Sequence, residues 1–194
     1  MSIQLKYLAD LYTGFTIRES LEHIDVGDVK TIQIKDLPKD SRIIDTENLT
    51  GIDWRYDSKP QFLSKDSVLL VARGVPSAFI FKGTESDRVV VSNPFIVINL
   101  NSDKVSPDYL AWYITNSQMA RTHFESNSTG ISLPITTIKT VKELPVILPS
   151  LSEQKYILAL EEQALLEAQA FERLTALRQE YNLTEAERIL TETN

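Results

Sequence analysis

The side chains best suited to bind a ligand lie in a short polar loop. Residues 127–130 read Asn-Ser-Thr-Gly, and their amide and hydroxyl groups match phosphate oxygens and base edges in size and polarity. Lys139 and Lys142 follow, and as long point charges they are better suited to contact phosphates than to read bases. A plain surface turn explains the same loop equally well. Both interpretations, a nucleic-acid contact and a surface turn, stay open at this point.

Two fragments contain residue types found in catalytic motifs without the required spacing. Residues 92–95, Ser-Asn-Pro-Phe, contain part of the Asn-Pro-Pro-Tyr/Phe motif of amino-methyltransferases, but the second proline is missing and no glycine-rich cofactor loop follows a first strand. Residues 27–30, Gly-Asp-Val-Lys, contain the Asp-x-Lys fragment of a nuclease core but no well-placed upstream acid. We interpret the first as a turn inside a β segment and the second as a solvated loop. We therefore predict a protein without catalytic activity of its own.

Metal, cofactor and disulfide chemistry are not predicted. The chain has no cysteine, and His23 and His123 cannot form a conventional zinc site without it. No carboxylate cluster has a spacing diagnostic of magnesium. We expect a cytoplasmic protein, because a cysteine-free chain fits a reducing compartment, no apolar run reaches 18 residues, and the N-terminus does not resemble a signal peptide.

The charge is unevenly distributed along the chain. The net charge is −7, which argues against a generic nucleic-acid binder, since such proteins are usually basic. Residues 151–194 hold nine acids and four bases, whereas residues 1–150 hold eighteen acids and sixteen bases. The front part is therefore close to neutral, and a local basic face on it is compatible with the composition.

The strand and helix patterns on either side of the polar loop predict an α/β (more narrowly α+β) fold of mixed β-sheet and short helices. Alternating and apolar runs predict strands, and Ser106-Pro107-Asp108 is a helix start. The expected strands are residues 29–37, 66–73, 77–83 and two short strands within 88–100 separated at Asn93-Pro94; the expected helix runs from 108 to about 124; and residues 142–149 form a short strand or an extended segment.

A long helix is predicted at the C-terminal end. Ser150 and Glu153 have the spacing of a capping box, in which each side chain accepts a hydrogen bond from the other residue's backbone N–H. No proline or glycine follows Pro149, so the helix can continue to about Tyr181. We therefore predict a globular domain over residues 1–149 and a spacer or dimerisation helix over 150–194. Its apolar stripe has heptad-like spacing and is wide enough to leave a seam for another helix: Ile157, Leu160, Ala164, Phe171 and Leu174.

Several of these segments together resemble the DNA specificity subunits of Type I restriction–modification systems. In that family a small-Gly turn precedes a pattern close to "ipLPPLxEQ" and a conserved helix; here Thr129-Gly130, "LPVILPSLSEQ" and Ile157 stand in those places. Upstream, "VKTIQIKDL", "DSVLLVARG" and "SPDYLAWYITN" are similar to further family segments in the same order. The similarity covers about Leu5 to Tyr181. The chain departs from the family in having Ser150 at the second proline, and in having one domain and one helix instead of two of each.

The resemblance implies DNA contacts. It places the turn at Arg73 and Gly74 on the DNA-facing side, although an arginine that extends from a strand end into solvent is an equally ordinary explanation. Arg18 and Lys35 are weaker candidates for DNA contact by the same reasoning. The other candidates are the loop residues Asn127, Ser128 and Thr129 and, after the loop, Lys139.

The resemblance also implies partners: double-stranded DNA, DNA methyltransferase subunits that supply S-adenosylmethionine, and, as an optional further subunit, a restriction helicase-nuclease. An acidic chain should bind DNA weakly alone, because phosphate neutralisation supplies most non-specific affinity. Two copies joined through the helix would each read one half-site and restore the two-domain arrangement of the family. The alternative function is a protein-interaction module without DNA binding, such as a regulator or inhibitor of such a complex.

Overall fold

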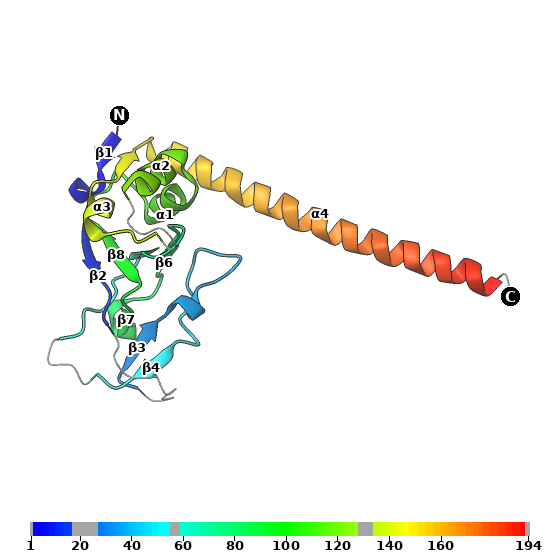
Figure 1. Cartoon of the computed structure of the whole chain (residues 1–194), viewed down its shortest axis with the longest axis horizontal. Coiled ribbons are helices and arrows are strands. Elements are labelled where there is room, and N and C mark those ends of the chain that lie inside the picture. The colour runs from blue at the N-terminus through cyan, green and yellow to red at the C-terminus, as the bar shows by residue number, and fades with distance from the viewer. Residues whose placement is uncertain (1, 17–26, 55–58, 128–133, 193–194) are drawn as a thin grey trace. The chain divides into compact units, whose positions relative to one another are not determined.

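The computed structural model describes residues 2–16, 27–54, 59–127 and 134–192. The chain divides into two compact units, Met1–Gln154 and Lys155–Asn194. Among the described residues, the first unit is a mixed arrangement of three small sheets and short helices (Figure 1). The predicted α+β class with a long C-terminal helix is confirmed.

The largest sheet contains four antiparallel strands in the order β2-β8-β5-β6. Leu69 on the inner strand β5 lies opposite Val97 on one side and Phe79 on the other. Every residue of β5 is buried, which explains why this strand is a continuous apolar run. The strands expected at 66–73 and 77–83 are present in shorter form as β5 and β6, and they pair as a hairpin around Gly74-Val75-Pro76. The strands are β2 (Ala9–Thr13), β5 (Val68–Val71), β6 (Ala78–Ile80) and β8 (Phe95–Leu100).

A second sheet has the order β4-β3-β7, with β3 antiparallel to β4 and parallel to β7. Its strands are β3 (Val29–Ile32), β4 (Thr50–Ile52) and β7 (Val89–Val91). The break expected at Asn93-Pro94 is confirmed, because β7 ends before it and β8 of the larger sheet begins directly after it. Val91 and Phe95, on either side of that break, belong to the same buried cluster.

One predicted strand is shorter than expected. Residues 29–37 were expected to be extended, but β3 ends at Ile32 and a 3-10 turn, η2 (Ile34–Asp36), follows. The Gln33 N–H donates to the Asp36 carboxylate at 2.8 Å, which closes the turn and ends the strand. Two other 3-10 turns are η1 (Leu5–Tyr7) and η3 (Glu85–Asp87).

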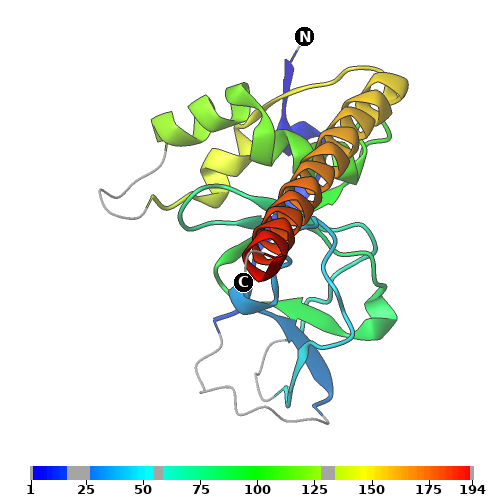
Figure 2. The same cartoon turned by 90° about the vertical axis from the view of Figure 1, so that its right-hand side faces the viewer.

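Three short helices gather at one end of the first unit, while β3 and β4 lie at the other end (Figures 1 and 2). The two-stranded sheet of β1 (Ser2–Gln4) and β9 (Pro145–Ile147) lies beside the helices. The hydroxyls of Tyr109 and Tyr113 on α1 donate to the carbonyls of Ile147 and Pro145, at 2.9 and 2.8 Å. The helices are α1 (Pro107–Asn116), α2 (Gln118–Asn127) and α3 (Ile138–Lys142).

The single helix predicted from 108 to about 124 is instead two helices. Ser117 has an extended backbone, with φ −69° and ψ 130°, and separates α1 from α2. The residues expected to face the core are nevertheless buried on both helices: Leu110, Tyr113, Ile114 and Ala120. The change of direction keeps these apolar side chains in the core.

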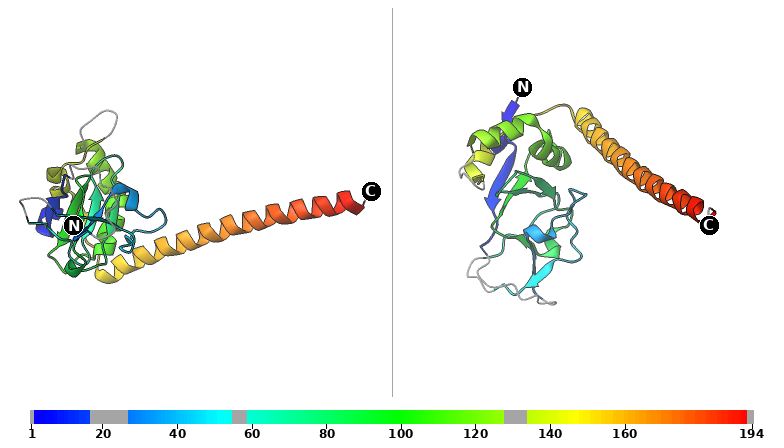
Figure 3. Two further views of the ribbon diagram at one scale, coloured as in Figure 1. Left: turned by 90° about the horizontal axis from the view of Figure 1, so that it is seen from below. Right: turned by 45° about the vertical axis from the view of Figure 1, so that its right-hand side comes forward.

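Helix α4 (Leu151–Glu192) has 42 residues and is longer than predicted (Figure 3). At about 1.5 Å per residue it extends about 63 Å. The predicted capping box is present: the Ser150 N–H donates to the Glu153 carboxylate at 2.8 Å, and the Glu153 N–H donates to the Ser150 hydroxyl at 3.3 Å. None of the described helices is long and apolar enough to cross a membrane.

Candidate nucleic-acid interface

The turn at Arg73 and Gly74 lies where β5 ends and is hydrogen-bonded to a distant segment. Arg73 is exposed, and Gly74 has φ 85°, a left-handed conformation that favours glycine. The Gly74 N–H donates to the Pro134 carbonyl at 2.9 Å, and the Thr136 N–H donates to the Ala72 carbonyl at 2.8 Å. Residues 134–136 follow the polar loop. The turn therefore anchors one described end of that loop.

The other described end of the loop is attached to α3. Asn127 is the last residue of α2, and its carbonyl accepts a long hydrogen bond of 3.5 Å from the Thr140 hydroxyl. The His123 Nε2 lies 2.8 Å from the Thr140 carbonyl. Thr137, which caps α3, accepts from the Thr140 N–H at 3.1 Å. Both ends of the loop are thus bound to structured parts of the first unit.

Four of the predicted contact residues lie on the described segments that flank the loop or are hydrogen-bonded to those segments: Arg73, Gly74, Asn127 and Lys139. Lys139 is exposed on α3, three residues after Thr136, and Lys142 is exposed on the same helix. Ser128, Thr129 and Arg18 lie outside the described residues. DNA contact by any of these residues stays a prediction.

Two predicted contact residues have side-chain hydrogen bonds within the unit. The Asn127 side chain donates to the His123 carbonyl at 2.8 Å, so its amide oxygen remains as the acceptor for a base or backbone donor. Lys35 is exposed in η2, next to the β4-β3-β7 sheet, and its ammonium donates to the Thr50 hydroxyl at 3.3 Å. Lys35 therefore lies beside the β4-β3-β7 sheet, whereas Arg73 follows β5 of the larger sheet.

Two other cations are held by carboxylates of the same unit. Lys82 contacts Asp66 at 2.9 Å and Asp108 at 3.1 Å. Burial alone would lower the pKa of Lys82, but the hydrogen bonds to Asp66 and Asp108 outweigh it and raise the pKa. Arg88 donates to the Asp28 carbonyl at 2.7 Å and to its carboxylate at 3.4 Å. Both cations stabilise the fold, which makes Arg73 and the α3 lysines the better candidates for phosphate contacts.

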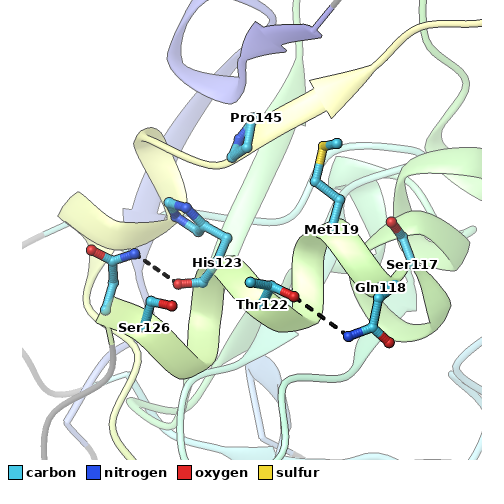
Figure 4. A pocket seen from close by; sticks show the side chains of 8 residues that line it. Ser117, Gln118, Met119, Thr122, His123, Ser126 and Pro145 are labelled. Carbon is cyan, nitrogen blue, oxygen red and sulfur yellow. Dashed lines mark hydrogen bonds between the residues drawn. The ribbon is translucent and has the colours of Figure 1, made fainter.

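An open groove of about 770 Å³ runs along α2 and borders Asn127 (Figure 4). Its side chains are mainly amides and hydroxyls, with Met119 as the large apolar member. Sequence reasoning did not identify this groove. The sequence does contain a signal for it: Gln118, Thr122 and Ser126 are polar and four residues apart. Residues at this spacing lie on one face of a helix. The lining residues are Ser117, Gln118, Met119, Thr122, His123, Ser126, Asn127 and Pro145.

Both catalytic-like fragments have structural roles in this fold. The Asn93 side chain donates to the Thr16 hydroxyl at 2.9 Å in the turn between β7 and β8. The Asp28 carboxylate accepts from the Trp54 N–H at 2.8 Å as well as from Arg88. Within the part of the chain that the structure describes, no group of three or more His, Cys, Asp or Glu side chains is placed to hold a metal ion.

A known family matches most of the chain. The sequence model described as "Type I restriction modification DNA specificity domain" matches residues 1–163. None of the curated protein sequences matches closely enough to count as a relative.

Solved structures have a similar fold at low sequence identity. A chain of a type I R-M system, from a study of its complex assembly and conformational transition, has a TM-score of 0.62 at 16% identity, covering 91% of this chain and 40% of that one. The HsdS subunit from Thermoanaerobacter tengcongensis has a TM-score of 0.59 at 16% identity, with coverages of 89% and 39%. The Type-I restriction-modification S subunit from M. genitalium has 0.50 at 13%, with coverages of 81% and 36%. This chain therefore spans well under half the length of each of these proteins.

Proposed function

This chain belongs to the Type I restriction modification DNA specificity domain family, and we propose that it recognises a DNA sequence without catalysing a reaction. The observation that carries this proposal is the anchored polar loop. Its two described ends are bound to the Arg73–Gly74 turn and to α3, so exposed cations flank a segment of small polar residues. Cations that contact phosphates, beside small groups that contact base edges, are the combination that sequence-specific recognition requires.

The same chemistry assigns different roles to the residues of this interface. Arg73 has the planar donor fork that can bind a guanine edge or a phosphate with two hydrogen bonds. Lys139 and Lys142 act as phosphate contacts. The loop residues Ser128 and Thr129, with the Asn127 amide oxygen, read base edges.

Methyltransferase subunits are the proposed partners. The chain has a net charge of −7, so few phosphates can be neutralised by this protein alone, and its own affinity for DNA is weak. A methyltransferase bound to the same duplex would supply the remaining phosphate contacts. It would also supply S-adenosylmethionine and flip the target adenine out of the duplex. A restriction helicase-nuclease is a further partner where the complex also cuts DNA.

A two-fold homodimer through α4 is the proposed assembly. Helix α4 has 42 residues, and its described residues after Gln154 are exposed or partly exposed. Two copies would present two reading units, and the symmetry of the protein would be matched by an inverted-repeat target. The predicted seam residues on α4 are exposed or partly exposed, and an apolar surface of this extent favours a partner: Ile157, Leu160, Ala164, Phe171 and Leu174.

Selection from randomised duplexes, with and without the neighbouring methyltransferase, tests DNA recognition. We expect an enriched inverted repeat. Arg73→Ala should weaken binding to the selected site about 5- to 100-fold if Arg73 reads a base, and Lys139→Ala should reduce the salt dependence by about one phosphate. Lys65→Ala is the matched control, because Lys65 is exposed at the opposite end of β5. If no motif is enriched under either condition, DNA recognition by this chain is refuted.

The second candidate function is a protein-interaction module that regulates such a complex. It is favoured by the acidic net charge and by the Asn127 side chain, one of whose two amide N–H donors is already used within α2. This alternative predicts tight binding to the methyltransferase, no enriched DNA motif and unchanged binding in Arg73→Ala.

A further inference from the structure

Between Ile157 and Tyr181, two charged residues interrupt the apolar stripe of α4, and Glu185 and Arg188 continue the same spacing beyond it. Positions along the stripe follow at alternating steps of three and four residues, the spacing of a helix–helix seam. The residues at these positions are Ile157, Leu160, Ala164, Glu167, Phe171, Leu174, Arg178 and Tyr181. Glu167 and Arg178 thus occupy places where a seam normally has apolar side chains.

Neither charge is neutralised within its own helix. The Glu167 carboxylate accepts a hydrogen bond from the Gln163 side-chain amide at 3.1 Å, but an amide carries no charge. The residues three and four positions away from Glu167 and from Arg178 are uncharged, whereas Arg188 pairs with Glu185 and Glu192 at this spacing. Burying Glu167 or Arg178 in a seam without a partner of opposite charge would be costly.

The direction of a second helix decides what these charges would meet. In a parallel pair, identical seam positions face each other, so Glu167 would face Glu167 and Arg178 would face Arg178. Like charges at such positions are destabilising. The seam has two alternating kinds of position, one followed by a step of three residues and the other by a step of four. In an antiparallel pair, each position of one kind faces a position of the other kind, so Glu167 can face Arg178 of the second helix.

We propose that α4 pairs antiparallel with a second copy of itself in the one register that places Glu167 opposite Arg178 of the second copy. This register rests on the proposed homodimer. Because the pair is two-fold symmetric, the same ion pair forms twice. Phe171 then lies opposite Leu174 at the centre, and Ala164 lies opposite Tyr181.

The central residues of this register are uncovered in the single chain. Phe171 is 69% exposed and Leu174 is 59% exposed. They would lie next to the two-fold axis, with Ala170 and Leu177 along their edge. The two ion pairs would flank this apolar centre on either side.

Neighbouring registers leave the charges without partners. A slip of one heptad in one direction places Glu167 opposite Phe171 and Arg178 opposite Leu160. A slip in the other direction places Glu167 opposite Glu185. The proposed register instead brings Glu185 and Arg188 opposite Leu160 and Ile157, where the two charges already pair with each other at 3.1 Å. Charge complementarity therefore selects one register.

Disulfide crosslinking measures the register directly, because the natural chain has no cysteine. Full-length chains carrying Ala164→Cys and Tyr181→Cys are mixed, oxidised and weighed by mass spectrometry. We expect the mixed dimer to crosslink, and Ala164→Cys alone to give no crosslink. A crosslink between two Ala164→Cys chains indicates a parallel pair, and one between Ala164→Cys and Leu174→Cys indicates a slipped register. Either result overturns the register and leaves the dimer intact.

A charge exchange gives an independent measurement. Glu167→Arg and Arg178→Glu should each weaken the dimer at least about tenfold in sedimentation equilibrium, because each creates two like-charge contacts. The double variant should recover affinity to within about threefold, because it restores both ion pairs. Equal loss in the single and double variants refutes the register. Phe171→Glu separates the two proposals: a wild-type chain that stays monomeric at tens of micromolar, unchanged by Phe171→Glu, refutes the homodimer itself.

Discussion

Replacing Gln154 tests the energetic reasoning most directly. Gln154 is fully buried although it lies at the start of a helix whose other described residues are exposed or partly exposed. Its amide nitrogen donates to the carbonyls of Lys104 at 2.8 Å and Pro149 at 3.0 Å, and its amide oxygen accepts from the Ser106 N–H at 2.9 Å. One side chain thus satisfies three backbone groups, one just before α4 and two in the loop before α1.

Gln154→Ala should destabilise the first unit by about 3 kcal/mol. Each neutral hydrogen bond contributes a net of about 1 kcal/mol, and Gln154→Ala removes the partner of three partly buried backbone groups. With a urea m-value of about 2 kcal/mol/M, the unfolding midpoint should fall by about 1.5 M. Gln154→Glu should be more damaging at neutral pH, because a carboxylate would face two carbonyl oxygens. Its defect should shrink on acidification, since burial raises the pKa of such a carboxyl and protonation restores a donor.

Tryptophan fluorescence is a suitable readout, because Trp54 and Trp112 both belong to the first unit. Gln169→Ala makes the same change at an exposed position of α4 and is the matched control. Equal midpoints for Gln154→Ala and Gln169→Ala would refute the assigned role of these hydrogen bonds.

Three further predictions concern single residues. Gly14→Ala should lower the urea midpoint of the first unit by an amount equivalent to about 2 kcal/mol or more, because a Cβ there would collide with the Ser92 carbonyl; an unchanged midpoint contradicts this. Burial raises the pKa of Tyr12 and of Tyr109 from 10.0 to about 12. Their contribution to stability is therefore complete below pH 10.0 and is lost as the pH rises through about 12. An absorbance titration should resolve a late class of tyrosines that Tyr12→Phe reduces, whereas a single transition near pH 10 argues against burial. Hydrogen bonds from the Ser150 hydroxyl and N–H lower the pKa of Glu153 from 4.5, so its capping contribution is present above pH 4.5 and is lost as the pH falls through the lowered pKa. Circular dichroism should show Glu153→Gln to be less sensitive to acid than the natural chain, and equal sensitivity counts against the capping role.

Local signals predicted the elements that local interactions determine. The β5–β6 hairpin follows from two apolar runs around Gly-Val-Pro, and the start of α4 follows from the Ser150–Glu153 capping box. Both involve residues close in sequence, so a pattern of residue types is sufficient to identify them. The break at Ser117 has no such signal, because neither proline nor glycine marks it. It follows from the packing of α1 and α2 into one core.

Elements that depend on distant partners were missed for the same reason. Strand β1 has three residues and pairs with β9 across the length of the first unit, so it has no recognisable periodicity. Strand β9 itself lies within residues 142–149, where a short strand or an extended segment was expected. Helix α3 has five residues, which is too short for an amphipathic pattern. The contact of Arg73 and Gly74 with residues 134–136 likewise joins segments about 60 residues apart. The sequence identified Arg73 as a candidate, and the structure showed which segment lies beside it.

The motif that made the family recognisable has a structural role in this fold. In the segment Leu-Ser-Glu-Gln, Glu153 caps the outside of the first turn of α4, and Gln154 satisfies buried backbone groups on the inside. Ser106, whose N–H donates to Gln154, also caps α1 through its hydroxyl, which accepts from the Tyr109 N–H at 3.2 Å. One short motif thus joins the starts of two helices.

The hydrogen bonds of Glu153 and Gln154 hold the fold together and do not depend on which DNA sequence is recognised. The residues proposed to read DNA lie elsewhere, at the Arg73–Gly74 turn and around the loop after Asn127. Among the described ones, Arg73, Asn127 and Lys139 are exposed. Substitutions among such exposed side chains cost little stability. Two chains with this fold can therefore share the Glu153–Gln154 motif and recognise different DNA sequences.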